Sequence, residues 1–422
     1  IHGLSFFRNG ELLARVNYRD MGTEELGSVY ESLLENHPII DVEKKPWGFG
    51  FLRDAENSKK KKTKGSVRKL TASYYTPASL VGEIIKSALD PVIEETKAKN
   101  SASPKSALLK LKIIDPACGS GHFLLAAARR LATEVATLTA TGESPDESER
   151  RHALREVVQH CIYGVDLNPL AVELCKTALW IETLEVGKPL SFLDSHILCG
   201  DSLVGVMKAK DIAQGIPAKA YKALRGDEST VCNELKRRNS VGSLDVVQPS
   251  LFNVEALDSV TQELTKIDTM PEETLKDILD KKIAWQTVLI DSDTVAETTK
   301  ADLFTSAFFA RKISTELDSI AVTEDLGRAS LGMAQRDKVI AACKTLAAHQ
   351  KYFHWYLAFP EVFKQGGFDV VLGNPPWEQT QIKEKEWFAV RNPKIAKALG
   401  NQRKTMIKAL ATEDPAVFTA FA

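Results

Sequence analysis

Leu111 to Gly121 reads LKIIDPACGSG: an apolar strand, then a carboxylate, then a turn with two glycines. We expect a strand over Leu111–Asp115 and a helix with an almost continuous alanine and leucine face over Gly121–Leu138. The glycines let the backbone turn tightly and approach a ligand, and a helix N-terminus presents N–H groups there. Taken alone, this is also an ordinary strand-to-helix turn. As a ligand site it suits a cationic amine, with these candidate residues: Asp115, Ala117, Gly119 and Gly121.

Strands and helices alternate on both sides of this turn. We expect further strands over Cys161–Asp166, His196–Cys199 and Phe368–Gly373, and helices over 78–98 and Pro169–Glu185. This order predicts an α/β fold, namely a Rossmann-like parallel sheet with helices on both faces. Between the third and fourth strands, residues 205–350 are polar and helix-periodic in patches, which predicts a large helical insertion.

A second acid stands at the end of the second expected strand, in Gly164-Val165-Asp166-Leu167-Asn168-Pro169. An acid at this place accepts hydrogen bonds from ribose hydroxyls in nucleotide-binding folds, which makes Asp166 and Leu167 candidates. The acid lies about 50 residues after the glycines instead of about 20, so either an extra helix intervenes, for which Asp146–Gln159 is suitable, or the ligand differs. Asp166 could equally cap the helix that Pro169 begins.

A third acid follows the third strand, in Gly200-Asp201-Ser202-Leu203. Asp201 and Ser202 are candidates for binding the exocyclic amine of an adenine ring, although Asp201 alone is just as readily an ordinary loop aspartate. Upstream, Tyr74-Tyr75-Thr76-Pro77 opens a helix, with Thr76 placed as its N-cap. The same helix start could hold a ligand's carboxylate, a role compatible with capping, which adds Tyr75, Thr76 and Pro77 to the candidates.

The fourth strand ends in Asn374-Pro375-Pro376-Trp377. Two prolines make the turn stiff, because each fixes its own φ and restricts the residue before it. The side-chain oxygen of Asn374 and the carbonyl of Pro375 offer two acceptors for an aromatic amine, whose lone pair is otherwise delocalised into its ring. Trp377 can stack on a base turned out of a duplex. The alternative is a structural turn with a half-buried tryptophan.

The composition of the 422 residues is that of a soluble globular protein, with 44% hydrophobic and 26% charged residues. With a formal charge of −1, the molecule as a whole gives no electrostatic indication of nucleic-acid binding, so a DNA-binding surface is local or lies outside this chain. A lysine run at 59–64 could touch phosphates but is equally a solvated loop. We expect no signal peptide, no membrane span and no metal site. The six cysteines are expected to be unpaired, which fits the reducing cytoplasm, and the chain is expected to be a fragment of a longer polypeptide.

Taken together, Asp115–Gly121 and Asn374–Trp377 resemble the signature motifs of amino-group methyltransferases, most closely the N6-adenine DNA methyltransferases. Tyr74–Pro77, Asp166 and Asp201 fall where that family has its other cofactor contacts. The motif order and the long helical insertion resemble large single-chain enzymes of the type IIG restriction–modification and phage-defence kind. The resemblance covers residues 20–205 and 350–380.

The resemblance implies that S-adenosylmethionine binds at the cofactor candidates above and that Asn374, Pro375, Pro376 and Trp377 hold a flipped adenine. The methyl group would pass directly to the adenine amine, without Cys118 as a nucleophile. The implied partners are double-stranded DNA and other defence-system subunits. By this resemblance the chain divides into an N-terminal helical segment with a basic loop (1–70), a cofactor-binding part (71–204), the insertion (205–350) and a truncated catalytic part (351–422).

Several alternatives remain open at this stage. Enzymes with a similar fold and turn methylate cytosine amines, RNA bases or a glutamine side chain in proteins. A non-catalytic DNA-binding subunit is a different class, although it has no reason to keep Asn374 and the strand-end acids. The chain departs from the family pattern in two ways. It shows neither a target-recognition domain nor the motifs that complete the sheet, and it has no nuclease signature.

Overall fold

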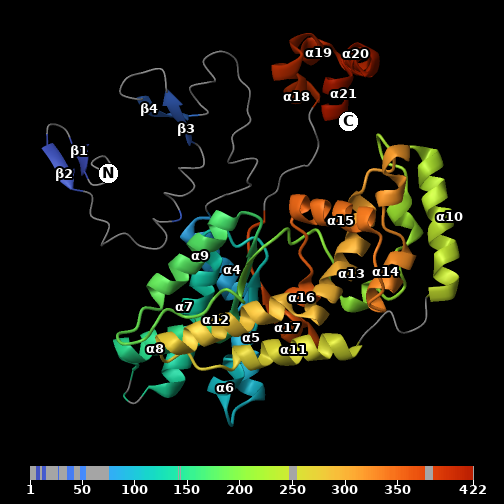
Figure 1. Ribbon diagram of the computed structural model, residues 1–422. Coiled ribbons are helices and arrows are strands. Elements are labelled where there is room, and N and C mark those ends of the chain that lie inside the picture. Colours follow the sequence, from blue (N-terminus) through green and yellow to red (C-terminus); the bar gives the residue numbers. More distant parts are fainter. Residues whose placement is uncertain are drawn as a thin grey trace.

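The computed structural model describes residues 6–9, 12–15, 27, 36–41, 48–53, 76–140, 142, 144–246, 254–375 and 384–421 (Figure 1). Its centre is a four-stranded sheet in the order β7-β6-β5-β8. The strands are β5 (Ile113–Asp115), β6 (Ile162–Asp166), β7 (Ile197–Cys199) and β8 (Val370–Val371), and every pairing is parallel. The predicted α/β fold is therefore confirmed.

The chain reverses direction across this sheet. It steps from β5 outward to β6 and β7, then returns to place β8 on the other side of β5. In open parallel sheets, ligands bind beyond the carboxyl ends of the strands, at such a reversal. The strand expected over 368–373 is only two residues long, for two reasons. The N–H of Lys112 donates to the carboxylate of Asp369 instead of a backbone carbonyl, and Gly373 leaves the sheet with φ +152°.

Helices cover one face of the sheet and an aromatic cluster with two short helices covers the other. Side chains alternate between the faces along each strand, so Ile113 packs in one core and Ile114 in the other. The first core is closed by α4 (Ala78–Ala88), α5 (Asp90–Lys99), α7 (His122–Thr139), α8 (Glu147–Cys161) and α9 (Pro169–Glu182). The second contains Phe353, Trp355 and Phe359, carried on or beside α16 (Trp355–Ala358) and α17 (Pro360–Lys364).

The single helix expected over 78–98 is two helices. Pro91 lies in the first turn of α5 and has no N–H, so it cannot continue the hydrogen bonding of α4. The short α6 (Pro104–Leu108) follows. The extra helix expected over 146–159 is α8, and Asp146 begins it with a capping box: its side chain accepts from the N–H of Glu149, whose carboxylate in turn accepts from the N–H of Asp146.

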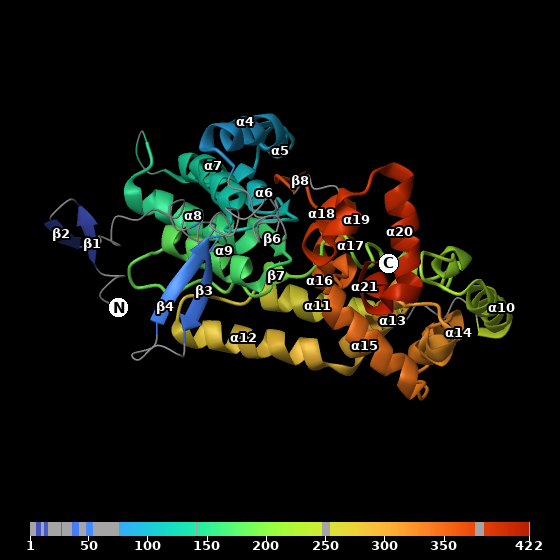
Figure 2. The same cartoon turned by 90° about the horizontal axis from the view of Figure 1, so that it is seen from above.

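Between β7 and α16 the described residues form helices joined by loops, without a named strand. The elements are η2 (Ala209–Asp211), η3 (Ala218–Tyr221), α10 (Ser229–Val246), α11 (Val254–Asp268), α12 (Leu275–Ile290), α13 (Ser292–Phe309), η5 (Ser314–Ser319), α14 (Thr323–Ser330) and α15 (Asp337–Gln350). Helices α10, α13, α14 and α15 lie together at one side of the molecule, away from α7 and α8 (Figures 1 and 2). Much of this region shares a core of its own, which includes Tyr221, Leu235, Leu303 and Leu326.

The two ends of the chain carry smaller elements. After β8 come α18 (Glu384–Arg391), α19 (Pro393–Lys397), α20 (Gly400–Glu413) and α21 (Pro415–Phe421), which share a small core around Phe388. Near the start, two antiparallel hairpins pair β1 (Phe6–Asn9) with β2 (Leu12–Arg15) and β3 (Asn36–Asp41) with β4 (Gly48–Arg53).

The N-terminal segment, expected to be helical, thus contains four strands that the sequence did not predict. Strands of four to six residues give little alternation to detect. Of the helix expected near 24–35, only Gly27 is described, and it is helical. The lysine run lies outside the described residues. The division of the chain into four segments stays a prediction.

Candidate active site

Four candidate side chains follow the carboxyl ends of the four parallel strands. Asp115 ends β5 and Asp166 ends β6, while Asp201 and Asn374 stand shortly after β7 and β8. Because the strands are parallel, these ends meet at one edge of the sheet. The four candidates from the sequence thus converge in the fold.

The glycine-rich loop after β5 is fastened to the loop after β6. The N–H of Gly119 donates to Asp166 Oδ2 at 2.8 Å, and the N–H of Cys118 donates to the carbonyl of Val165 at 2.9 Å. Gly121 has φ +90°, and a methyl group on it would come within 2.8 Å of Cys175 Sγ. At Gly119, by contrast, no described atom lies within 4 Å of the position that a Cβ would take. The loop therefore leaves an open space beside it.

Asp115 is a buried carboxylate, only 1% exposed. Burial raises its pKa to about 7; the N–H of Ala117, which donates to Oδ1 at 2.9 Å, opposes this rise, and the charge of Asp166 adds to it. Across the reversal of the chain, a methyl group on Gly373 would come within 2.6 Å of the same oxygen. A cation beside Asp115 would favour its ionised form, so this environment suits a ligand with an amine.

Asp166 organises both loops that it adjoins. Its Oδ1 accepts from the N–H of Asn168 at 2.8 Å, and its Oδ2 accepts from Gly119. Burial raises the pKa of Asp166, whereas these two N–H groups and the charge of Lys351 act in the opposite direction. The alternative that Asp166 caps α9 is wrong, because the side chain of Asn168 does so by accepting from the N–H of Leu170.

The loop after β7 is held by the segment that follows α15. The N–H of Asp201 donates to the carbonyl of Lys351 at 2.8 Å, and Asp201 forms a parallel bridge with Tyr352. Within the loop, Asp201 Oδ1 accepts from the N–H of Leu203 at 3.0 Å. The carbonyl of Ser202 accepts from Trp355 Nε1 at 3.0 Å.

Thr76 connects the start of α4 to the turn after β8. The predicted capping role of Thr76 is wrong: Pro77 occupies the N-cap and no side chain caps the helix. Instead, Thr76 is buried, and Asn374 Nδ2 donates to Thr76 Oγ1 at 3.2 Å. This bond fixes which end of the Asn374 amide faces α4. Pro375 is exposed at the described end of the turn. Tyr75, Pro376 and Trp377 lie outside the described residues.

Comparison with known proteins places this arrangement in a family. The model of the Eco57I restriction-modification methylase family matches residues 160–408, more than half of the chain. The chain belongs to the Eco57I restriction-modification methylase family. The DNA-methyltransferase domain of MmeI matches residues 93–198. Between them the two matched ranges include all four strand-end positions.

Individual relatives agree with this family. The chain is 23% identical over 361 residues to a putative type II restriction enzyme and methyltransferase of Methanocaldococcus jannaschii, covering 72% of the chain and 28% of that protein. It is 27% identical over 165 residues to the adenine-specific methyltransferase PglX of Streptomyces coelicolor, with 37% and 12% covered. The type II restriction enzyme and methyltransferase RM.Eco57I of Escherichia coli is 31% identical over 146 residues, with 31% and 14% covered. The chain thus spans well under a third of each of these relatives.

Three residues near the site were not predicted from the sequence. Lys351 contacts the loops after β6 and β7. Gly373 packs against Asp115. Its position directly before Asn374 in the predicted turn could have suggested this contact. Gly27 packs against the glycine-rich loop, since a methyl group on it would come within 2.5 Å of Ser120 Oγ. No local sequence pattern around Gly27 predicts this contact.

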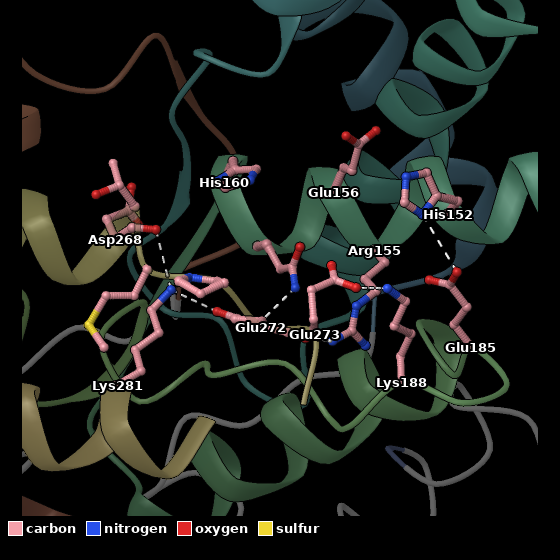
Figure 3. Close-up of a pocket in the computed structure, with 14 residues that line it drawn as sticks. His152, Arg155, Glu156, His160, Glu185, Lys188, Asp268, Glu272, Glu273 and Lys281 are labelled. Atoms are coloured by element: carbon pink, nitrogen blue, oxygen red, sulfur yellow. Dashed lines mark hydrogen bonds and ion pairs between the residues drawn. The ribbon is translucent and has the colours of Figure 1, made fainter. Parts of the chain in front are cut away.

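A cavity of about 380 Å³ lies at the other end of the sheet in this Eco57I-family chain, between α8 and the junction of α11 and α12 (Figure 3). Its lining is charged but internally paired: Lys281 Nζ bonds Glu272 at 2.7 Å, and Arg155 donates to the carbonyls of Pro189 and Glu272. His160 lies in the last turn of α8, directly before β6 begins, which marks this as the amino end of the strands. We therefore assign the cavity to the packing of α11 and α12 on α8.

Three further properties concern the described part of the chain. It contains no group of three or more His, Cys, Asp or Glu side chains that could hold a metal ion. None of its helices combines the length and the apolar character that crossing a bilayer requires. All six cysteines are free thiols, and Cys199 is the exposed one.

Proposed function

We propose that this chain transfers a methyl group from S-adenosylmethionine to the N6 amine of an adenine turned out of double-stranded DNA, within a restriction–modification or phage-defence system. The observation that carries the proposal is the meeting of Asp115, Asp166 and the Asn374 turn at one edge of the sheet. A cofactor held by the acids would lie next to a base held by the turn. Membership of a methylase family supports the same reaction.

The residues at the strand ends fit S-adenosylmethionine. The cradle at Gly119 leaves room for a ligand, and the buried carboxylate of Asp115 beside it suits the cationic amine of the methionine part. Asp166 has acceptor lone pairs for the ribose hydroxyls besides its bonds to two backbone N–H groups. Asp201 and Ser202 are the candidates for the adenine ring of the cofactor. When bound, the cofactor supplies an electrophilic methyl group on its sulfonium.

The turn after β8 prepares the amine of the target base. The side-chain oxygen of Asn374 and the carbonyl of Pro375 accept the two amine hydrogens, which favours the pyramidal nitrogen of the transition state. Because Asn374 Nδ2 already donates to Thr76, the amide is held with a defined end toward α4. We assign the stacking of the flipped base to Trp377. The amine loses its proton after transfer and needs no strong base.

The choice of adenine rests on the Asn-Pro-Pro-Trp sequence and on the relative from Streptomyces coelicolor, whose name specifies adenine. We propose double-stranded DNA as the substrate, other defence-system subunits as further partners, and the cytoplasm as the location. With a formal charge of −1, the chain offers no general attraction to DNA. Recognition of a particular sequence therefore falls to local contacts or to parts outside this chain.

The test is transfer of tritium from labelled S-adenosylmethionine to duplex DNA by the full-length protein, followed by nucleoside analysis. Label in N6-methyladenine is the expected result. Label in N4-methylcytosine would contradict the choice of base, and label in RNA or protein alone would contradict DNA as substrate. Asn374→Ala should abolish transfer while calorimetry finds nearly unchanged cofactor affinity. The matched control is Asn100→Ala, at the exposed end of α5, which should transfer methyl groups like the wild type.

A further inference from the structure

Lys351 ends α15 in a backbone conformation that normally belongs to glycine. It has φ 50° and ψ 55°, and it is the one non-glycine residue with a positive φ among those described. Its N–H donates to the carbonyl of Ala347, which closes the last turn of the helix. Glycine is the usual residue at such a helix end because a Cβ there costs about 1 kcal/mol or more. The side chain of Lys351 therefore has to provide something that glycine lacks.

The side chain and the backbone of Lys351 contact two different loops at the carboxyl edge of the sheet. Its ammonium donates to the carbonyl of Leu167, in the loop after β6, at 2.7 Å across 184 residues of sequence. Its carbonyl accepts from the N–H of Asp201, in the loop after β7, at 2.8 Å. One residue at the end of the helical region thereby links two loops that are far from it in the chain, and these loops also meet directly where the N–H of Gly200 donates to the carbonyl of Asp166 at 3.0 Å.

The charge of Lys351 acts in the same direction as its hydrogen bonds. Burial raises the pKa of Asp166, and the ammonium of Lys351 opposes that rise. Cys199, which this ammonium also influences, is a thiol whose pKa burial raises, so it remains neutral at physiological pH. The ammonium thus helps to keep Asp166 ionised, and an ionised carboxylate is the stronger acceptor for ribose hydroxyls.

We infer that Lys351 is a positioning residue for cofactor binding: it holds the loops of Asp166 and Asp201 at the separation that a bound nucleoside requires. The inference rests on the proposed function for the identity of the nucleoside. Lys351 touches neither reacting atom, so its effect should appear in the affinity for S-adenosylmethionine. The turn that holds the base lies after β8, on the opposite side of β5 from these two loops.

Three variants of the full-length protein separate the ammonium from the backbone. Lys351→Met keeps the Cβ and the strained backbone but loses the donor, Lys351→Gly relaxes the backbone and loses the donor, and Lys351→Arg keeps a charged donor. Lys344→Met is the control, since Lys344 is an exposed lysine on the same helix. Affinity for S-adenosylmethionine is measured by calorimetry, and KM and kcat are measured at saturating DNA.

We expect Lys351→Met to weaken binding of S-adenosylmethionine about tenfold to a hundredfold, the range for a lost charge-assisted hydrogen bond. KM for the cofactor should rise similarly, while kcat at saturating cofactor and KM for DNA stay within about twofold of the wild type. Lys351→Arg should recover most of the affinity. Lys351→Gly should melt at a higher temperature than Lys351→Met and yet bind the cofactor no better, because it relieves the backbone without restoring the donor.

Wild-type affinity of Lys351→Met for S-adenosylmethionine would overturn the inference. Wild-type affinity of Lys351→Gly would also overturn it, because the residue would then serve only to end the helix. An Arg variant as weak as the Met variant would also overturn the argument from the charged donor. These outcomes differ from failure of the proposed function, in which the wild-type protein itself would bind no S-adenosylmethionine.

Discussion

Asp115→Asn should change how the stability of the ligand-free protein depends on pH. The substitution keeps the size of a side chain that is 1% exposed and keeps an acceptor for the N–H of Ala117. In the wild type, burial raises the pKa of Asp115 from 3.8 to about 7, with the charge of Asp166 adding to the rise. The folded protein therefore retains a proton here over a pH range in which the unfolded chain has lost it.

The sign and size of the effect follow from this difference in proton binding. Between about pH 4 and about pH 7 the folded state binds more protons than the unfolded state, so the free energy of unfolding falls as pH rises. One pKa unit corresponds to about 1.4 kcal/mol, so the rise from 3.8 to about 7 corresponds to roughly 4 kcal/mol once the group is ionised. The stabilising contribution of the protonated form is complete below the unfolded pKa and lost above the folded one.

The assay is urea unfolding of the wild type and of Asp115→Asn between about pH 5 and about pH 8. The wild type is expected to lose roughly 3 kcal/mol more than the variant across this range, because about 1–2 kcal/mol of the penalty already applies at the lower end. Other titrating groups are common to both proteins and cancel in the difference. Parallel stability curves would refute the assignment of a raised pKa to this carboxyl group.

The same group links ligand binding to proton release. A cationic amine placed beside Asp115 lowers its pKa, so binding at about pH 6 should release close to one proton. Calorimetry in two buffers of different ionisation enthalpy measures this number directly. Asp115→Asn should release none from this position. Equal proton release by both proteins would place the amine of the ligand elsewhere.

Three further substitutions test the site and its support. Asp166→Ala should weaken S-adenosylmethionine binding about tenfold or more while Asn374-dependent steps remain intact, and unchanged affinity in calorimetry would place the ribose contact elsewhere. Gly373→Ala should lower kcat, since its methyl group would push into a buried carboxylate 2.6 Å away, which single-turnover methylation rates can measure. Lys281→Met removes the ion-pair partner of buried Glu272, which keeps its hydrogen bonds from Gln159 and the N–H of Phe192. It should cost up to about 3–5 kcal/mol in urea unfolding, against under about 1 kcal/mol for exposed Lys86→Met.

The sequence was sufficient to predict the parallel sheet and the convergence of its strand ends. Asp115 and Asp166 each follow an apolar run, and parallel strands necessarily bring such positions to one edge. Asn374 joins them because β8 pairs with β5, a consequence of the chain reversal that the order of motifs does not itself reveal. What periodicity and turn residues determine locally was therefore predictable, together with what the topology of parallel strands imposes.

The remaining contacts depend on residues that meet only in the folded protein. Thr76 has the sequence position of an N-cap, but Pro77 takes that place and the hydroxyl of Thr76 accepts from Asn374 across 298 residues of sequence. Lys351 shows the opposite case: nothing in its neighbourhood indicates a positive φ, because lysine rarely adopts one. Pro91 is a missed signal of a purely local kind, since a proline within an apparently continuous helix divides it.

The ends of the helical region explain how so long an insertion is compatible with an ordered site. Its two ends run side by side: Asp201 donates to the carbonyl of Lys351, and Phe353 and Trp355 donate to the carbonyls of Val204 and Val206. Because the two ends of the helical region are hydrogen-bonded to each other, the length of this region adds little to the entropy cost of bringing β7 and β8 into one sheet. The same pairing holds the loop of Asp201, and the chain then crosses the second face of the sheet through Phe359 to reach β8. Lys351 is therefore one point at which the helical region is joined to the loops of Asp166 and Asp201.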